Sequence, residues 1–146
     1  MARVIRPGFA FAVVSDVGFV VGLHMHRDKL MGYLIWLSQR TFEEMPTVDD
    51  ASAIDRWRWC VFYPLGAAID RNIDIPIGNI PIPPDLQHFP RMRSGRGPQP
   101  WFQHDDGNFV GFGTPTQDRT LPIRMSVNDT RLKEMLVSGW TPSQRW

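Results

Sequence analysis

Two histidines separated by one residue are the clearest hint of chemistry in the chain. His24 and His26 flank Met25 in an apolar run, and residues two apart on a strand face the same side. Two imidazoles on one side are a geometry that proteins use to bind metal ions. If folding brought His104 close to them, the three side chains could hold a single metal ion. The competing interpretation is a histidine pair at an exposed strand end, and we prefer it, so no cofactor is expected.

Arginines in a glycine- and proline-rich loop offer a second kind of chemistry. Arg91, Arg93 and Arg96 precede Trp101, and basic side chains beside an aromatic ring can bind phosphates and stack on bases. The whole chain has a formal charge of only +1, which favours neither DNA nor an anionic membrane as a partner. Nucleic-acid binding is therefore a disfavoured alternative, and the same arginines suit a solvated loop or a protein contact.

The sequence contains no recognisable catalytic motif. No serine lies in a nucleophile elbow, and no glycine-rich loop leads into a helix as phosphate-binding loops do. His104 and Asp105 could act as acid and base, but Asp-Asp-Gly-Asn over 105–108 is also the residue set of a tight hairpin turn. The turn is the preferred interpretation. We expect no catalytic residues and no enzymatic activity.

One strongly charged stretch has the chemistry of a binding surface. Between Arg40 and Arg56, every charged residue is acidic. These residues are Glu43, Glu44, Asp49, Asp50 and Asp55. Such a run is often only a solvated face, but it also suits a basic protein partner, because it would steer association and cover a cationic surface. We expect these five residues to form the partner-binding surface.

The elements that would position these side chains are mainly strands. Large apolar residues among small ones over 8–15 and 19–26, with a turn at 16–18, predict a hairpin. The apolar run 30–37 extends it to a three-stranded meander. The most aromatic run, 57–65, is predicted to be a central strand.

Prolines separate the two halves of the chain between 75 and 86. Four isoleucines alternate there with proline, glycine and asparagine, which excludes a helix and predicts an edge strand or a polyproline-like connector. We expect buried isoleucines to hold this connector and a turn near Gly78. Beyond it, aromatic runs on both sides of an Asp-Gly turn predict a hairpin over 101–113, and 121–127 predicts a further strand.

Helices are expected to be few and short. Thr41 with Glu44 has the spacing of a capping box, and Asp49-Asp50 could start a second short helix. The clearest helix covers 130–138, after an asparagine or aspartate cap and before a glycine stop. Together the elements predict an α+β fold: a predominantly antiparallel β-sheet, partly open and barrel-like, with one or two short helices and a C-terminal helix.

Size and composition predict a single domain in a reducing compartment. The chain has 146 residues, of which 42% are hydrophobic and 21% charged, as in one globular domain over 1–146. Residues 120–146 could be an extension. The lone cysteine, Cys60, lies in an apolar run and is expected to be a buried, unreactive thiol. No apolar run could span a membrane, and the start of the chain does not fit a signal peptide, so we expect a cytoplasmic protein without a membrane partner.

Several of these segments together resemble the immunity protein 26 family, bacterial proteins that neutralise polymorphic toxins. The resemblance spans roughly residues 5 to 115 and does not include 120–146. It rests on Gly8-Phe9-Ala10-Phe11-Ala12, the apolar strand ending near Pro64, Ile77-Gly78-Asn79-Ile80-Pro81, and Trp101-Phe102 before a hairpin.

The resemblance implies a bacterial, cytoplasmic, β-rich binding protein without catalytic residues. Such a protein would bind and occlude a co-encoded protein toxin. The acidic residues between 43 and 55 separately suggest that they contact this toxin and that it is a nuclease or another cationic effector. The activity of the toxin and the oligomeric state do not follow from the resemblance. The alternative that the residues leave open is a small metal- or ligand-binding β-barrel protein that uses His24, His26 and His104.

Overall fold

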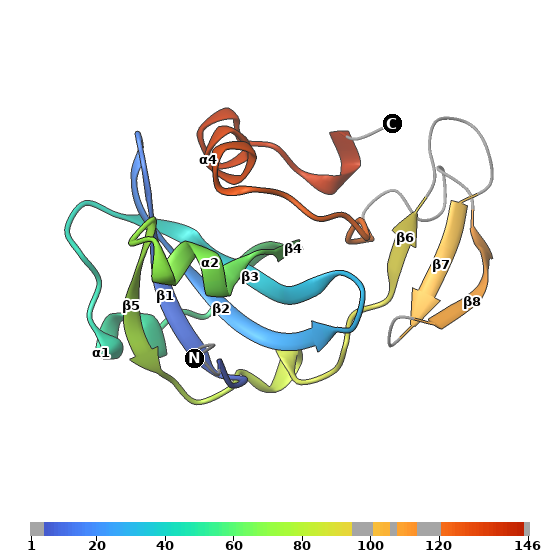
Figure 1. Ribbon diagram of the computed structural model, residues 1–146, viewed down its shortest axis with the longest axis horizontal. Helices are drawn as coiled ribbons and strands as arrows, with labels where there is room; N and C mark the ends of the chain where they lie inside the picture. The colour runs from blue at the N-terminus through green and yellow to red at the C-terminus, as the bar shows by residue number, and fades with distance from the viewer. Residues whose placement is uncertain (1–4, 95–100, 106–107, 114–120, 145–146) are drawn as a thin grey trace.

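The described part of the chain folds into two antiparallel sheets and a few short helices, the sheet-dominated α+β fold that the sequence predicts. The computed structural model describes residues 5–94, 101–105, 108–113 and 121–144, with side chains for 5–94 and 121–143. The first sheet (Figure 1) contains β1 (Phe9–Ser15), β2 (Gly18–Asp28), β3 (Gly32–Phe42), β4 (Trp57–Tyr63) and β5 (Asp74–Asn79). The second contains β6 (Met92–Ser94), β7 (Trp101–Asp105) and β8 (Asn108–Gly113). The helices are α1 (Val48–Ser52), α2 (Leu65–Asp70) and α4 (Asp129–Ser138), with 3-10 turns η1 (Pro84–Leu86) and η2 (Pro142–Gln144).

The predicted meander is present in the first sheet. β1 and β2 are joined by a two-residue turn, since Ser15 pairs with Gly18, and β3 follows antiparallel to β2. Gly22 lies opposite Phe11, and a Cβ at this glycine would overlap the phenyl ring. The small residue at position 22 therefore leaves room for the large side chain of Phe11 on the neighbouring strand. The pairing of β2 with β3 continues to Phe42, beyond the predicted end of the third strand.

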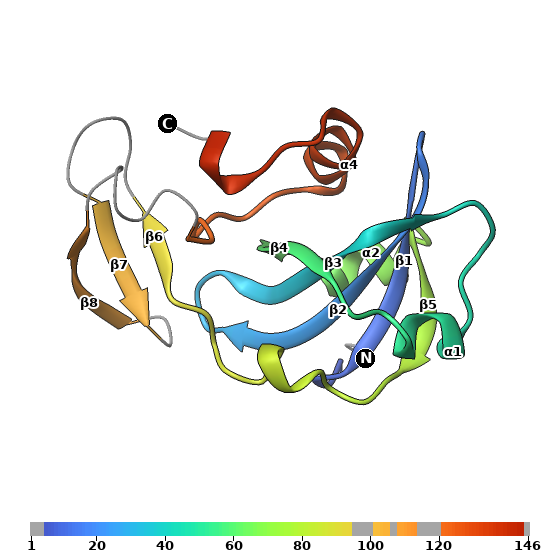
Figure 2. The same cartoon turned by 180° about the vertical axis from the view of Figure 1, so that it is seen from behind.

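Both faces of the first sheet are covered. On one face, Phe11, Ile35 and Val61 pack beneath α2 and α4 in one core. On the other face, Leu23 lies in a core that contains residues of α1 and of the proline-rich segment. Figures 1 and 2 show α4 on one side of the sheet and the proline-rich segment on the other. The sheet is thus the middle layer of the molecule.

The aromatic strand β4 is an edge strand of the sheet, so its prediction as a central strand is wrong. The strand order is β4-β3-β2-β1-β5, so β4 is the last strand on its side of the sheet within the described ranges. Its outer edge is bridged by the C-terminal segment instead. The amide of Phe62 donates to the carbonyl of Met125 at 3.0 Å, and that of Val127 donates to the carbonyl of Phe62 at 2.9 Å. The apolar composition of β4 therefore reflects burial on two faces and a covered edge.

The same C-terminal segment also bonds to the second sheet. The amide of Arg93 in β6 donates to the carbonyl of Pro122 at 2.9 Å, and the carbonyl of Arg93 accepts from the amide of Arg124 at 2.8 Å. The predicted strand over 121–127 is thus reduced to isolated parallel bridges, at Ile123 and Ser126. It connects the two sheets. The predicted hairpin over 101–113 is confirmed as β7 and β8, with its turn outside the described residues.

The proline-rich segment begins as an edge strand, as predicted. β5 pairs antiparallel with β1, and the register shifts so that Ile77 has no partner between Pro76 and Gly78. The turn predicted near Gly78 is wrong, because Gly78 lies within β5 and pairs with Ala10. Its φ of 143° is a backbone conformation that residues with a side chain rarely adopt. Ile80 is buried, whereas Ile75 is exposed, so only some of the isoleucines hold the segment.

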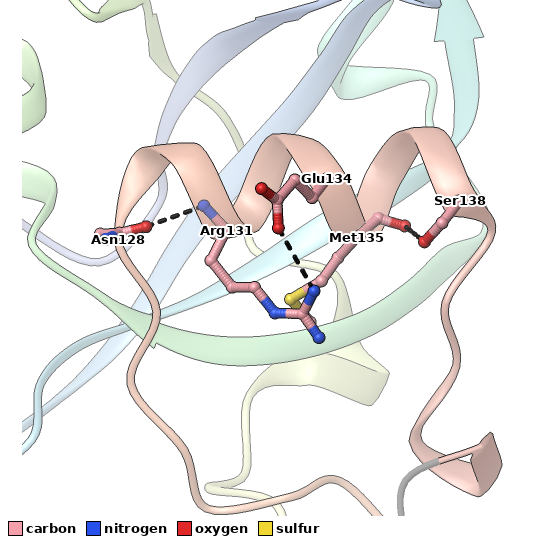
Figure 3. Close-up of polar contacts among 5 residues, drawn as sticks. All are labelled: Asn128, Arg131, Glu134, Met135 and Ser138. Carbon is pink, nitrogen blue, oxygen red and sulfur yellow. Dashed lines mark hydrogen bonds and ion pairs between the residues drawn. The ribbon is translucent and has the colours of Figure 1, made fainter.

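The two predicted caps of the C-terminal helix α4 are confirmed. The side chain of Asn128 accepts a hydrogen bond from the amide of Arg131 at 2.8 Å (Figure 3), and Gly139 ends the helix with φ 71°. Its apolar residues Leu132, Met135 and Leu136 are buried against the first sheet. Residues 121–144 therefore contribute to the same core as the first sheet.

Of the two short helices predicted in the acidic stretch, the one at Asp49-Asp50 is confirmed as α1, and the one at Thr41 is not. α1 begins with a capping box at Thr47 and Asp50, and Thr41 still belongs to β3, so the helix predicted at Thr41 and Glu44 is wrong. α2 was not predicted, because its six residues directly follow the proline that ends β4. None of the helices in the described ranges is long and apolar enough to cross a membrane.

Candidate functional site

The two histidines of β2 do not share a face, contrary to the prediction. His24 pairs with Ile35 and His26 pairs with Leu34, because the register between β2 and β3 shifts between them. Ile35 belongs to the core beneath α4, whereas Leu34 belongs to a core on the opposite face. The β-bulge therefore turns the two imidazoles away from each other.

The preferred interpretation, a histidine pair at an exposed strand end, is also wrong, because His24 is buried and each histidine packs against an aromatic ring. His24 is 1% exposed, and its ring meets the edge of Tyr33 with centroids 5.1 Å apart. Burial lowers the pKa of His24, and the charges of His26 and Arg27 lower it further by smaller amounts. The hydrogen bond to the carbonyl of Leu34 acts in the opposite direction and raises it. His26 packs on Phe89 at 5.2 Å. Among the described residues, no group of three His, Cys, Asp or Glu could hold a metal ion. The side chain of His104 lies outside them.

Among the arginines considered for phosphate binding, Arg93 has a structural role instead. Arg93 is fully buried, and its guanidinium donates to the carbonyl of Pro142 at 2.6 Å and to that of Leu121 at 3.3 Å. It holds the C-terminal segment against β6 and cannot reach a ligand in solvent. Arg91 is exposed, and Arg96 and the side chain of Trp101 lie outside the described residues.

The five acidic residues are all exposed, and they lie in the segment that leads from the end of β3 through α1 to β4. Asp50 has a structural task, because its carboxylate accepts the amide of Thr47 at 2.9 Å and completes the capping box. These hydrogen bonds lower the pKa of Asp50. The other four, Glu43, Glu44, Asp49 and Asp55, remain candidates for contact with a partner.

The turn between β1 and β2 extends this acidic surface. Phe19, just after the turn, pairs with Phe42, which directly precedes Glu43, so Asp16 and Val17 lie beside the acidic stretch. Both residues are exposed. We call the turn and the acidic stretch together the acidic end, made of Asp16, Val17, Glu43, Glu44, Met45, Val48, Asp49 and Asp55. Of these, Val48 and Asp49 belong to α1, which lies farther from the turn, because Val48 packs against Gly78 of β5.

Exposed apolar side chains and shallow hollows accompany the carboxylates of the acidic end. Val17, Met45 and Val48 are among the few large apolar residues exposed in the described ranges. A hollow of about 540 Å³ is lined by Glu43, Glu44 and Met45, among others. A second one, of about 210 Å³, is lined by residues 53–56 and shares Arg40 with the first. Arg40 lies with its guanidinium 4.4 Å from the ring centre of Phe42, so the surface is acidic but not uniformly so.

A buried titratable pair connects the two edge strands, and the sequence offered no signal for it. The hydroxyl of Tyr63, at the end of β4, donates to the carboxylate of Asp74, at the start of β5, over 2.6 Å. Asp74 is 1% exposed, and burial raises its pKa to about 6. Burial and the neighbouring carboxylate also raise the pKa of Tyr63. Cys60 is buried as predicted, and burial raises the pKa of its thiol, which keeps it unreactive.

Another hollow, of about 670 Å³, lies between the β1–β2 hairpin and α4. Sequence reasoning missed it because its two walls are more than 100 residues apart in the chain. Val14 forms part of one wall and Val137 part of the other. The geometry thus combines acidic and apolar groups at one end of the first sheet.

The comparisons with known proteins leave the function to be argued from this surface. The resemblance to the immunity proteins is not tested by them and stays a prediction. No family model matches the chain, and neither a curated protein nor a solved structure is significantly similar to it.

Proposed function

We propose that this chain is a non-catalytic binding protein that neutralises a protein toxin encoded beside it, by covering a basic surface of the toxin with the acidic end. The observation that supports this proposal best is the composition of the acidic end. Carboxylates of Glu43, Glu44 and Asp49 are exposed there next to exposed Met45 and Val48.

The two kinds of side chain have complementary tasks in protein association. Exposed carboxylates attract a cationic partner over long distances and exclude acidic ones, which affects the association rate most. Apolar side chains that become buried at the centre of an interface supply most of the affinity. A nuclease is one suitable target, because its active site is basic where it holds phosphates.

The test is co-expression of the chain with the product of the adjoining reading frame in a bacterial host. We expect that product to arrest growth when expressed alone, and the intact chain to restore growth. The double variant Glu43→Lys/Glu44→Lys should restore growth less well. The matched control is Asp70→Lys/Asp85→Lys, which changes the charge equally at exposed positions of α2 and η1.

Two outcomes would contradict the proposal. If the adjoining product is harmless in the host, the chain has no co-encoded toxin to neutralise. If both double variants protect as well as the intact chain, the acidic end is not the contact surface. Circular dichroism of each variant should match that of the intact chain, since all four substituted side chains are exposed.

A further inference from the structure

The β1–β2 hairpin and α4 stand side by side at one end of the first sheet (Figure 1, Figure 2). The hollow of about 670 Å³ between them is lined by residues 14–16 of the hairpin and by residues of α4. Val14 is 39% exposed and Val137 is 47% exposed, so each wall of the hollow presents an apolar side chain to solvent. We call this hollow the hairpin–helix groove.

Acidic residues predominate along the rim of the groove. Asp16, Asp129 and Glu134 line it, and Lys133 is the one basic residue among its described lining. The positive charge of Lys133 also favours the ionised form of the buried carboxyl of Asp74, so it does not act on the groove alone. Glu134 lies 3.5 Å from Arg131 in an exposed pair (Figure 3), which binds weakly and can exchange partners.

The groove is continuous with the acidic end. Asp16 belongs to both, because it lines the groove and also lies in the turn beside the acidic stretch. A partner lying across this turn would contact α4 on one side and residues 43–45 on the other. The groove adds what the acidic stretch alone does not offer, a recess between two walls with exposed apolar side chains.

We infer that the hairpin–helix groove receives an apolar side chain of a protein segment that carries lysine or arginine next to it. The apolar side chain would lie between Val14 and Val137, and the basic side chain would meet Asp16 or Glu134. This inference rests on the proposed function for the identity of the partner, a basic protein. It adds the class of segment that the partner presents and the place where that segment is held.

The test uses methyl and amide NMR of the full chain, titrated with two capped tripeptides, Lys-Leu-Lys and Glu-Leu-Glu. Both present the same apolar side chain, and they differ only in the sign of the flanking charges. We expect Lys-Leu-Lys to shift the methyl signals of Val14 and Val137 and to bind at least about tenfold more tightly than Glu-Leu-Glu. Val137→Ser should weaken this binding about fivefold or more. The matched control is Leu30→Ser, because Leu30 is 88% exposed and lies at the other end of β3.

The possible outcomes distinguish a failure of the groove from a failure of the proposed function. Shifts confined to residues 43–49 would overturn the groove while leaving the acidic end as a contact surface. Equal binding of both peptides, or no effect of Val137→Ser, would overturn the preference for a basic segment in the groove. If Val14 and Val137 respond as expected but the adjoining gene product is harmless, the groove stands and the toxin-neutralising function fails.

Discussion

The carboxyl of Asp74 shows how a single buried group can set the response of the fold to pH. Burial raises its pKa to about 6, while the hydroxyl of Tyr63 and the charge of Lys133 work in the opposite direction. In the unfolded chain an aspartate titrates near its ordinary pKa of about 3.9. As the pH rises from about 4 to about 6, the unfolded chain loses this proton first, so the folded state loses stability across that window. Above about pH 6 the loss is complete and constant.

Asp74→Asn should therefore stabilise the protein at neutral pH and change little near pH 4. The amide keeps an acceptor oxygen for Tyr63 but cannot ionise. Raising the pKa of Asp74 from about 3.9 to about 6 corresponds to roughly 3 kcal/mol, which is the upper limit of the expected gain in free energy of unfolding. Urea unfolding of both proteins at about pH 4 and about pH 7.5 measures the gain. A variant less stable than the intact chain at about pH 7.5 would show that the carboxylate is stabilising instead.

A substitution at Thr47 tests whether the capping box stabilises α1. Its side chain accepts the amide of Asp50 at 3.1 Å, and its own amide is bonded by the Asp50 carboxylate. Thr47→Ala should lower the free energy of unfolding by about 1 kcal/mol. Thr41→Ala is the control, since Thr41 has the same spacing to an acidic residue but lies in β3, and its effect should stay within about 0.5 kcal/mol. Equal losses in both variants would mean that the cap contributes nothing specific to α1.

These two threonines also show why local patterns predict some elements and not others. Thr41 and Thr47 each precede an acidic residue at position i+3, and the sequence alone favours neither strongly. Pairing with β2 decides the choice, because Thr41 lies opposite Val20 in the ladder. In contrast, the caps of α4 need no distant partner, so Asn128 and Gly139 were predicted correctly. Signals that act within one turn could be read from the sequence, and those set by strand pairing could not.

The elements around β2 and β4 likewise show which features of the candidate site follow from local sequence and which depend on strand pairing. The meander was predictable because short turns join neighbouring strands. The bulge that separates His24 from His26 was not, because it depends on the register against β3. Nor was the edge position of β4, since the segment that covers its edge lies more than 60 residues later in the chain. The acidic residues themselves were found correctly as exposed, but the groove beside them required the tertiary structure.

The C-terminal segment should protect β4 from exchange with solvent. The amides of Phe62 and Val127 take part in the bridge between the two segments, whereas the amide of Ser126 points away from β4. We expect the Phe62 and Val127 amides to exchange at least about tenfold more slowly than that of Ser126, because exchange requires the bridge to open. Hydrogen exchange followed by NMR measures all three. If Val127 exchanges as fast as Ser126, the segment is not held on β4 in solution.

The whole molecule has a formal charge of +1, and this sum conceals a separation of charge. Carboxylates gather at the acidic end, whereas Arg27 and Lys29 are exposed at the β2–β3 hairpin, at the other end of β3. The net charge of the whole chain is therefore a poor guide to its partners, because a local electrostatic field guides a charged partner even when the total charge is close to zero. The two ends of the sheet should consequently differ in their choice of partner.

Association kinetics with the adjoining gene product should separate the two parts of the proposed surface. Glu43→Lys/Glu44→Lys should slow association by about threefold to tenfold at low ionic strength, because exposed charges act mainly on the encounter. The effect should largely vanish near 1 M salt, where the screening length is only about 3 Å. Val137→Ser should leave the association rate unchanged and speed dissociation, because a buried apolar contact acts after the encounter. Surface plasmon resonance at low and high salt measures both rates. If Glu43→Lys/Glu44→Lys changes only dissociation at every salt concentration, these carboxylates lie inside a desolvated interface rather than at its rim, and the partner must supply a basic group for each of them.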